Sequence, residues 1–177
     1  MEMNEKKIWL KHILNHGLVL GLSLSVVEFT ALFLGMLFRP IMPNIYMVLV
    51  IFLVYTSIRK YREVYLGGII SFKDAFLTGF LTCMLSGAIW AIYRFVEYSL
   101  SPSIVQEIIA STIEPFKESA MDEDTKELFI SITKTFTSAA SLSLINTFLY
   151  SMTFGGALLS VFLSFILKRN SIPSKTN

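Results

Sequence analysis

Four long apolar segments dominate this chain and direct it to a membrane. They cover residues 14–38, 41–58, 75–96 and 142–167. Each approaches or exceeds the roughly 18 apolar residues that a helix needs to cross a bilayer. The first and third contain one charged side chain each, Glu28 and Arg94, and the other two contain none. Of the 177 residues 54% are hydrophobic, so the remaining polar chain is too short to cover four such segments in water.

The pattern predicts an all-α protein, a bundle of four transmembrane helices in a single integral membrane domain over residues 1–170. The helices are expected at about 13–38, 41–58, 72–98 and 140–167, followed by a disordered tail over 171–177. Pro40 and Pro43 predict a tight turn between the first two helices. Ser71 and Asp74 form a capping-box pattern, which places the start of the third helix there.

The segment 99–138 differs from the rest because it is amphipathic. Isoleucines and valines of its first half fall on one helical face, and Pro115 should kink or end that helix. After the acidic run at 122–124, a second apolar stripe continues through Leu128 and Ile132. The sequence therefore predicts a helical hairpin outside the membrane, its second arm continuous or nearly so with the fourth transmembrane helix.

The distribution of charge predicts the orientation. Ten of the fifteen lysines and arginines lie before the first helix, between the second and third, or after the fourth. The stretch 97–138 instead carries eight acidic residues against three lysines. Basic loops remain in the cytoplasm, so both termini are expected there, with the segment 99–138 on the extracytoplasmic side. An even number of membrane crossings returns the chain to the side on which it began, so four helices are consistent with both termini in the cytoplasm.

Glu28 is the first candidate site residue, because an acid near the middle of a membrane helix costs about 2.5–3.5 kcal/mol on insertion scales. Gly17, Gly21 and Ser25 share its helical face. Such small residues allow close helix packing, so Glu28 is expected to point into the bundle. It is interpreted either as a protonatable relay or ligand contact, or as a structural ion pair or protonated acid.

Arg94 is the expected partner of Glu28, although both side chains would have to extend to meet. Arg94 shares its helical face with Gly79, a further packing residue. The fourth helix offers a polar face that would support the pair, or that makes ordinary interhelical hydrogen bonds: Asn146, Tyr150 and Thr153.

Other chemistry has little support in the sequence. His12 and His16 are four residues apart, a spacing compatible with a metal, but no third ligand follows, and interfacial histidines are the favoured interpretation. The single cysteine, Cys83, forms no intramolecular disulfide. No catalytic residue, metal site or cofactor is predicted, and the dispersed basic residues argue against nucleic acid.

A family resemblance begins at Tyr61-Arg62 and continues through Gly67-Gly68-Ile69-Ile70-Ser71-Phe72-Lys73-Asp74-Ala75-Phe76-Leu77-Thr78-Gly79. With the Gly17/Gly21 start of the first helix, this stretch resembles domain of unknown function 4199, a bacterial family of small four-helix membrane proteins. The resemblance extends from about His12 to Lys168. It implies the fold and an inner-membrane setting, and it implies no activity.

Two functions are expected from these features. The first is a non-enzymatic interaction or structural component of the bacterial envelope, in contact with the lipid bilayer and with a second copy of itself or another membrane protein. The second is a small transporter or permease subunit with a proton-coupled site at Glu28.

Overall fold

The computed structural model describes residues 3–34, 41–149 and 151–168, and in these ranges all the elements are helices. Four of them are long and apolar enough to cross a membrane: Glu5–Ala31, Met42–Tyr65, Phe72–Leu100 and Thr147–Leu167. The predicted all-α fold with four membrane spans is confirmed. The chain forms two compact units, residues 1–90 with 148–177 and residues 91–147.

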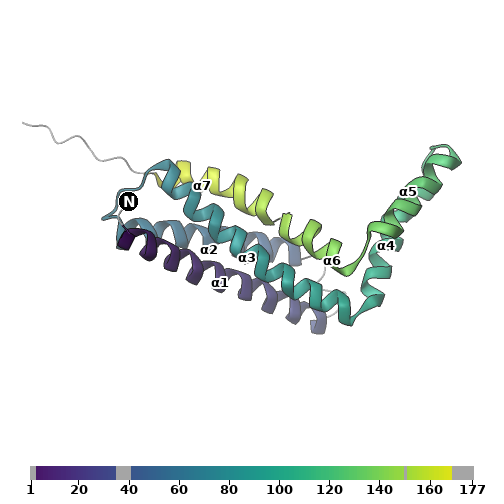
Figure 1. The fold of residues 1–177 in the computed structure, drawn as a ribbon, viewed down its shortest axis with the longest axis horizontal. Helices are drawn as coiled ribbons and strands as arrows, with labels where there is room; N and C mark the ends of the chain where they lie inside the picture. Colours follow the sequence, from purple (N-terminus) through teal and green to yellow (C-terminus); the bar gives the residue numbers. More distant parts are fainter. Residues whose placement is uncertain (1–2, 35–40, 150, 169–177) are drawn as a thin grey trace, which may run out of the picture. The chain divides into compact units, whose positions relative to one another are not determined.

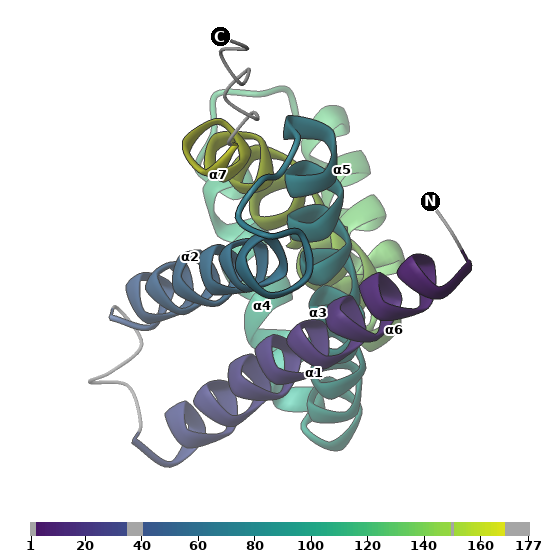
Figure 2. The same cartoon turned by 90° about the vertical axis from the view of Figure 1, so that its left-hand side faces the viewer.

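The first unit is an up-and-down helix bundle (Figure 1). Its elements are α1 (Met3–Leu34), α2 (Met42–Lys60), most of α3 (Phe72–Leu100), the π-helix η3 (Ser151–Leu158) and α7 (Leu159–Leu167). Figure 2 views the end where α1 and α3 begin and α2 and α7 finish. α1 starts at Met3, earlier than predicted. Glu5 in its first turn interacts favourably with the helix dipole, and the lysines that follow have high helix propensity.

Glycines let α1 approach α3 closely. A Cβ atom built on Gly17 would lie 2.7 Å from Cδ2 of Leu85, and one on Gly21 would lie 2.8 Å from Cβ of Ile89 and 3.0 Å from the Ser86 carbonyl oxygen. The two glycines are four residues apart, the small-residue spacing that brings membrane helices into backbone contact. The sequence Gly-Leu-Val-Leu-Gly therefore defines the side of α1 that faces α3.

α3 is the central helix of this unit, because glycines on its other sides let further helices approach it closely as well. A Cβ on Gly79 would lie 2.6 Å from Oγ of Ser160 on α7 and 3.0 Å from Cδ1 of Ile58 on α2. A Cβ on Gly87 would lie 2.7 Å from Cβ of Ser151. Of the four spans, α3 also has the largest buried share. Lipid tails are as apolar as leucine, so such close packing has to replace the hydrophobic effect in holding the helices together.

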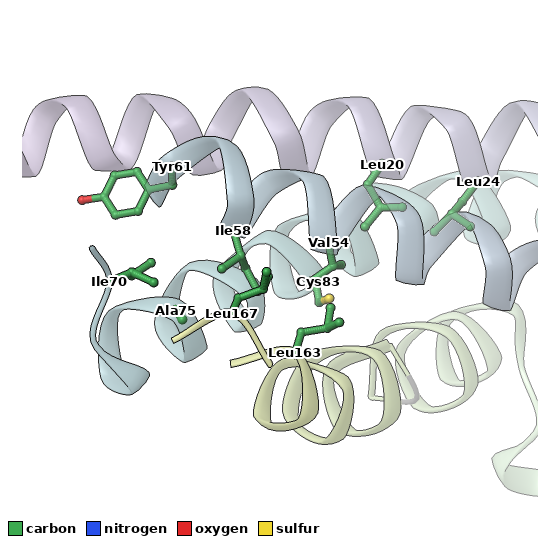
Figure 3. Close-up of a cluster of buried hydrophobic side chains, with 10 residues drawn as sticks. All are labelled: Leu20, Leu24, Val54, Ile58, Tyr61, Ile70, Ala75, Cys83, Leu163 and Leu167. Atoms are coloured by element: carbon green, nitrogen blue, oxygen red, sulfur yellow. The ribbon is translucent and has the colours of Figure 1, made fainter. Parts of the chain in front are cut away.

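The core of the first unit lies where α1, α2, α3 and α7 meet (Figure 3). Its buried members come from every helix and from the turn before α3: Leu20, Leu24, Val54, Ile58, Tyr61, Ile70, Ala75, Cys83, Leu163 and Leu167. The outward faces of the same helices stay exposed, as at Val48 (67%) and Phe162 (64%), which is expected for surfaces in contact with lipid.

A short π-helix and a glycine pair connect α2 to α3. The π-helix η1 (Tyr61–Tyr65) is followed by Gly67 and Gly68, which have φ angles of +60° and +89°. These left-handed conformations favour glycine because it lacks a Cβ. The predicted cap of α3 is confirmed: the Asp74 amide donates to Oγ of Ser71 at 3.1 Å, and the Ser71 hydroxyl donates to the Asp74 carboxylate at 2.7 Å.

The second unit contains the predicted helical hairpin, α4 (Pro102–Lys117) and α5 (Glu123–Phe136). α4 ends two residues after Pro115, as expected for a proline within a helix. At α5, the Asp122 side chain accepts a hydrogen bond from the Thr125 amide at 2.9 Å. The rings of Phe116 and Phe129 stack with centroids 4.0 Å apart and hold the two arms together.

The helical structure is interrupted between α5 and the fourth span. Thr137 is extended (φ −89°, ψ 97°), and Ser138 and Ser141 then exchange amide-to-hydroxyl hydrogen bonds that start α6 (Ala139–Ser141). A π-helix, η2 (Leu142–Leu149), follows α6. The sequence predicted one helix over 140–167, since periodicity does not separate a π-helix from an α-helix in a uniformly apolar run. The predicted tail at 171–177 and the end of the first helix near 38 lie outside the described residues.

Candidate functional site

A half-open cleft lies between α1 and α2, at the end of the first unit where α1 begins and α2 finishes. Its volume is about 620 Å³. Polar and basic side chains gather in it together with three apolar ones: Ile8, Lys11, His12, Asn15, His16, Val19, Leu53, Thr56, Lys60 and Tyr65. None of these lining residues is acidic, so the cleft is electropositive.

His12 anchors the floor of the cleft to α2. Its Nε2 lies 2.9 Å from the carbonyl oxygen of Ser57 and 3.4 Å from the Ser57 hydroxyl. A carbonyl oxygen only accepts, so Nε2 carries the proton and donates it to Ser57. His12 is 3% exposed and Ser57 is fully buried. This contact fixes the orientation of the imidazole ring and ties α1 to α2.

The hydrogen bonds continue from Ser57 into α3. The Thr82 hydroxyl donates to the Thr78 carbonyl oxygen at 2.7 Å, so its oxygen is left to accept the Ser57 hydroxyl proton over 3.3 Å. Nε1 of Trp9 donates to Oγ1 of Thr78 at 3.0 Å, and the Thr78 hydroxyl donates to the Asp74 carbonyl oxygen at 2.7 Å. Thr78 and Thr82 are fully buried. A polar network therefore joins α1, α2 and α3 behind the cleft.

The two histidines stack on each other. Their ring centroids are 4.1 Å apart, and Nδ1 of His16 donates to the His12 carbonyl oxygen at 3.0 Å. Tyr61 and Tyr65 place their rings 5.3 and 5.5 Å from that of His12. Among the described residues no cluster of three or more His, Cys, Asp or Glu side chains offers a metal site. The structure thus gives both histidines hydrogen-bonding and stacking partners.

Glu28 contacts α2. The Tyr46 hydroxyl donates to a Glu28 carboxylate oxygen, and both side chains are half-buried. The Tyr46 ring lies 5.4 Å from the ring of Trp90 on α3. A tyrosine on a facing helix is thus the hydrogen-bond partner of this carboxylate. The sequence predicted Arg94 as the partner and did not identify Tyr46.

Arg94 belongs to the second unit and pairs within its own helix. Its Nη1 lies 2.8 Å from Oε2 of Glu97, and its guanidinium carbon lies 4.6 Å from the centre of the Tyr98 ring. Glu97 is 8% exposed, which strengthens the pair relative to one in water. The coupling of Arg94 with Glu28 stays a prediction.

The remaining predicted residues are placed as follows. The Ser25 hydroxyl donates to the Gly21 carbonyl oxygen at 2.9 Å, and the Thr153 hydroxyl donates to the Leu149 carbonyl oxygen. The first contact lies within α1, and the second joins η3 to the last residue of η2. The side chain of Asn146 and the whole of Tyr150 lie outside the part of the chain that the structure describes.

Comparison with known proteins gives the family. The family model "Protein of unknown function (DUF4199)" matches residues 15–169. The chain belongs to this family. No curated protein and no solved structure matches it. The resemblance seen around the Gly-Gly and Ser-Phe-Lys-Asp motif is thereby confirmed, and this DUF4199 protein has four helices able to span a membrane as a multi-pass protein.

The polar network of this DUF4199 protein was missed by sequence reasoning. Its signal was present, because Thr78, Thr82 and Ser86 recur at four-residue intervals on the predicted third helix and so occupy one face. Ser57 lies near the end of the second apolar segment and Trp9 in the basic stretch before the first, and only the packing of three helices shows that they meet this hydroxyl face.

Proposed function

We propose that this DUF4199 protein is a non-enzymatic component of the bacterial inner membrane that binds a partner protein through its helical hairpin. One observation carries the proposal: α5 has apolar side chains that the described chain leaves partly or largely exposed. Leu128 is 61% exposed, Phe129 41% and Ile132 46%. Apolar surface of this kind on a polar helix is typical of an interaction site.

The face is well defined because α5 is strongly amphipathic. Leu128 and Ile132 are four residues apart and therefore adjacent on the helix. Charged residues occupy the other side, where Lys126 pairs with Glu123 at 2.9 Å. Phe129 packs on Phe116 of α4 while leaving part of its surface open. The hairpin therefore presents a rigid apolar strip that a second membrane protein, or a second copy, would cover.

The proposed orientation puts both termini in the cytoplasm and the hairpin outside. It is supported by the positive-inside rule and by the even number of candidate spans. A single cysteine at Glu118, in a Cys83→Ser background, should react with a membrane-impermeant maleimide in intact spheroplasts, whereas a single cysteine at Lys73 should react only after lysis. The reverse labelling pattern would refute the orientation.

Photo-crosslinking tests the binding function. Benzoylphenylalanine placed at Leu128 or Ile132 should give one discrete protein adduct in native membranes. The same group at Glu127, on the polar side of α5, is the matched control and should give none. Adducts to lipid alone from the apolar positions, or equal adducts from all three positions, would contradict the proposal.

The second candidate function is transport with a proton-coupled site at Glu28. The observation that favours it is the hydrogen bond between Glu28 and Tyr46 across two membrane spans. Proton-linked flux into liposomes holding the purified protein should be lost in Glu28→Gln and kept in Glu28→Asp. Flux that is equal in both variants, or no flux in the wild type, would exclude this role.

A further inference from the structure

The cleft between α1 and α2 holds two lysines without acidic partners. Lys11 and Lys60 are both exposed and both line it, and neither has a carboxylate within ion-pair distance among the described residues. The neighbouring arginines differ, because Glu63 lies 3.0 Å from both Arg59 and Arg62. The two cleft lysines therefore place unneutralised positive charge in the lining of the cleft.

Neutral donors surround the same space. The Asn15 amide and the Tyr65 hydroxyl line the cleft without a hydrogen-bond partner in the described chain. Cations and polar donors facing one concavity match a phosphate group, whose oxygens are strong acceptors.

The cleft changes character along the helices. Val19 lies eight residues after Lys11 on α1, about 12 Å deeper at 1.5 Å per residue. Leu53 lies opposite on α2, and Val19 is 52% exposed. Ile8 accompanies the cations near the helix ends, and further into the span the lining becomes apolar at Val19 and Leu53. A ligand that fits both zones has a phosphate at one end and a hydrocarbon chain at the other.

We propose that this cleft binds one anionic phospholipid, with the phosphate between Lys11 and Lys60 and an acyl chain against Val19 and Leu53. Basic pockets between membrane helices are suited to lipid headgroups. The buried network of His12 and Ser57 keeps α1 and α2 at a fixed spacing behind the site, so the pocket does not have to form on binding. The proposal is independent of the partner assigned to α5.

Native mass spectrometry of the full chain in a neutral detergent tests the site. The probe is phosphatidylglycerol, titrated against phosphatidylcholine. One phosphatidylglycerol should be retained in preference, and the double variant Lys11→Gln/Lys60→Gln should bind it about 25-fold more weakly, at about five-fold for each lysine near a lipid headgroup. Lys11→Arg/Lys60→Arg should retain binding, because it keeps both charges.

Lys6→Gln/Lys7→Gln is the matched control, because it removes the same charge from exposed residues that do not line the cleft. It should change the affinity less than two-fold. An equal loss in this control would show nonspecific attraction and overturn the proposal. Glycerol phosphate at millimolar concentration should not displace the lipid. If it binds as tightly as phosphatidylglycerol, the site takes phosphate from solution and the lipid assignment is wrong.

Discussion

Replacing Gly21 with alanine should separate α1 from α3. The new Cβ would lie 2.8 Å from Cβ of Ile89 and 3.0 Å from the Ser86 carbonyl oxygen. Carbon atoms normally pack at about 3.5–4.0 Å, so a shift of about 1 Å is needed. Neither obstructing atom can turn away, since one is a backbone atom and the other is bonded directly to the backbone.

The expected change in the free energy of unfolding is the difference between two opposing contributions. Overpacking of this kind costs about 1–3 kcal/mol, whereas alanine gains up to about 1 kcal/mol over glycine in helix propensity. Gly21→Ala should therefore lower the free energy of unfolding by about 1 kcal/mol. Gly156→Ala is the matched control, because its Cβ would lie 3.3 Å from Cδ2 of Phe80, a side-chain atom, and 3.4 Å from the Ser151 carbonyl oxygen. The control gains propensity with little packing cost, so the two variants should differ by about 2 kcal/mol.

Labelling of the Cys83 thiol can be used to measure unfolding. This residue is the single cysteine and is 1% exposed in the core of the bundle, so a thiol-reactive fluorophore labels it when the bundle opens. Labelling during a titration with sodium dodecyl sulfate in mixed micelles gives the midpoint of unfolding for each variant. If Gly21→Ala proves as stable as Gly156→Ala, the close approach of α1 to α3 is not a source of stability.

Three further predictions concern single contacts. Arg62→Met should lower the free energy of unfolding by about 2 kcal/mol, because the buried guanidinium donates to the Leu167 carbonyl oxygen at 3.1 Å; an unchanged labelling midpoint would contradict this. The hydrogen bond from the Thr125 amide lowers the pKa of Asp122, so the cap is complete at neutral pH and is lost as the pH falls through this lowered pKa, below the usual range of an aspartate. Amide NMR shifts at the α5 N-terminus should follow this loss and be flat in Asp122→Ala. Glu28→Gln and Arg94→Gln should show a coupling energy in a double-mutant cycle, whereas purely additive effects would refute the pair.

The fold was predictable because it depends on features that lie along the chain. Apolar length placed the four spans, and Ser71 with Asp74 marked the start of α3 from residue types and spacing alone. The hairpin could be predicted because its polar and apolar residues alternate with the helical period. Within the spans that contrast disappears, so the π-helices η2 and η3 left no signal in the pattern.

The candidate site was harder to predict from the sequence, because it depends on which helices contact each other. Charge drew attention to Glu28 and Arg94, but the described partners are a tyrosine on α2 and a glutamate one turn along α3. Two of the residues that line the cleft, Lys11 and Lys60, are 49 positions apart in the sequence. Their proximity depends on the pairing of α1 with α2, which the sequence predicts, and on the spacing set by His12, which it does not.

The central position of α3 has a consequence for how relatives of this protein diverge. Gly79 and Gly87 face other helices at distances that leave no room for a larger side chain, so a substitution there requires a second, compensating change elsewhere in the bundle. Val48 and Phe52 on α2 are 67% and 61% exposed, and apolar residues can replace each other at such positions one at a time. Across evolution, we expect α3 to change slowly and in concert with its neighbours, while the outward side of α2 drifts freely among apolar residues.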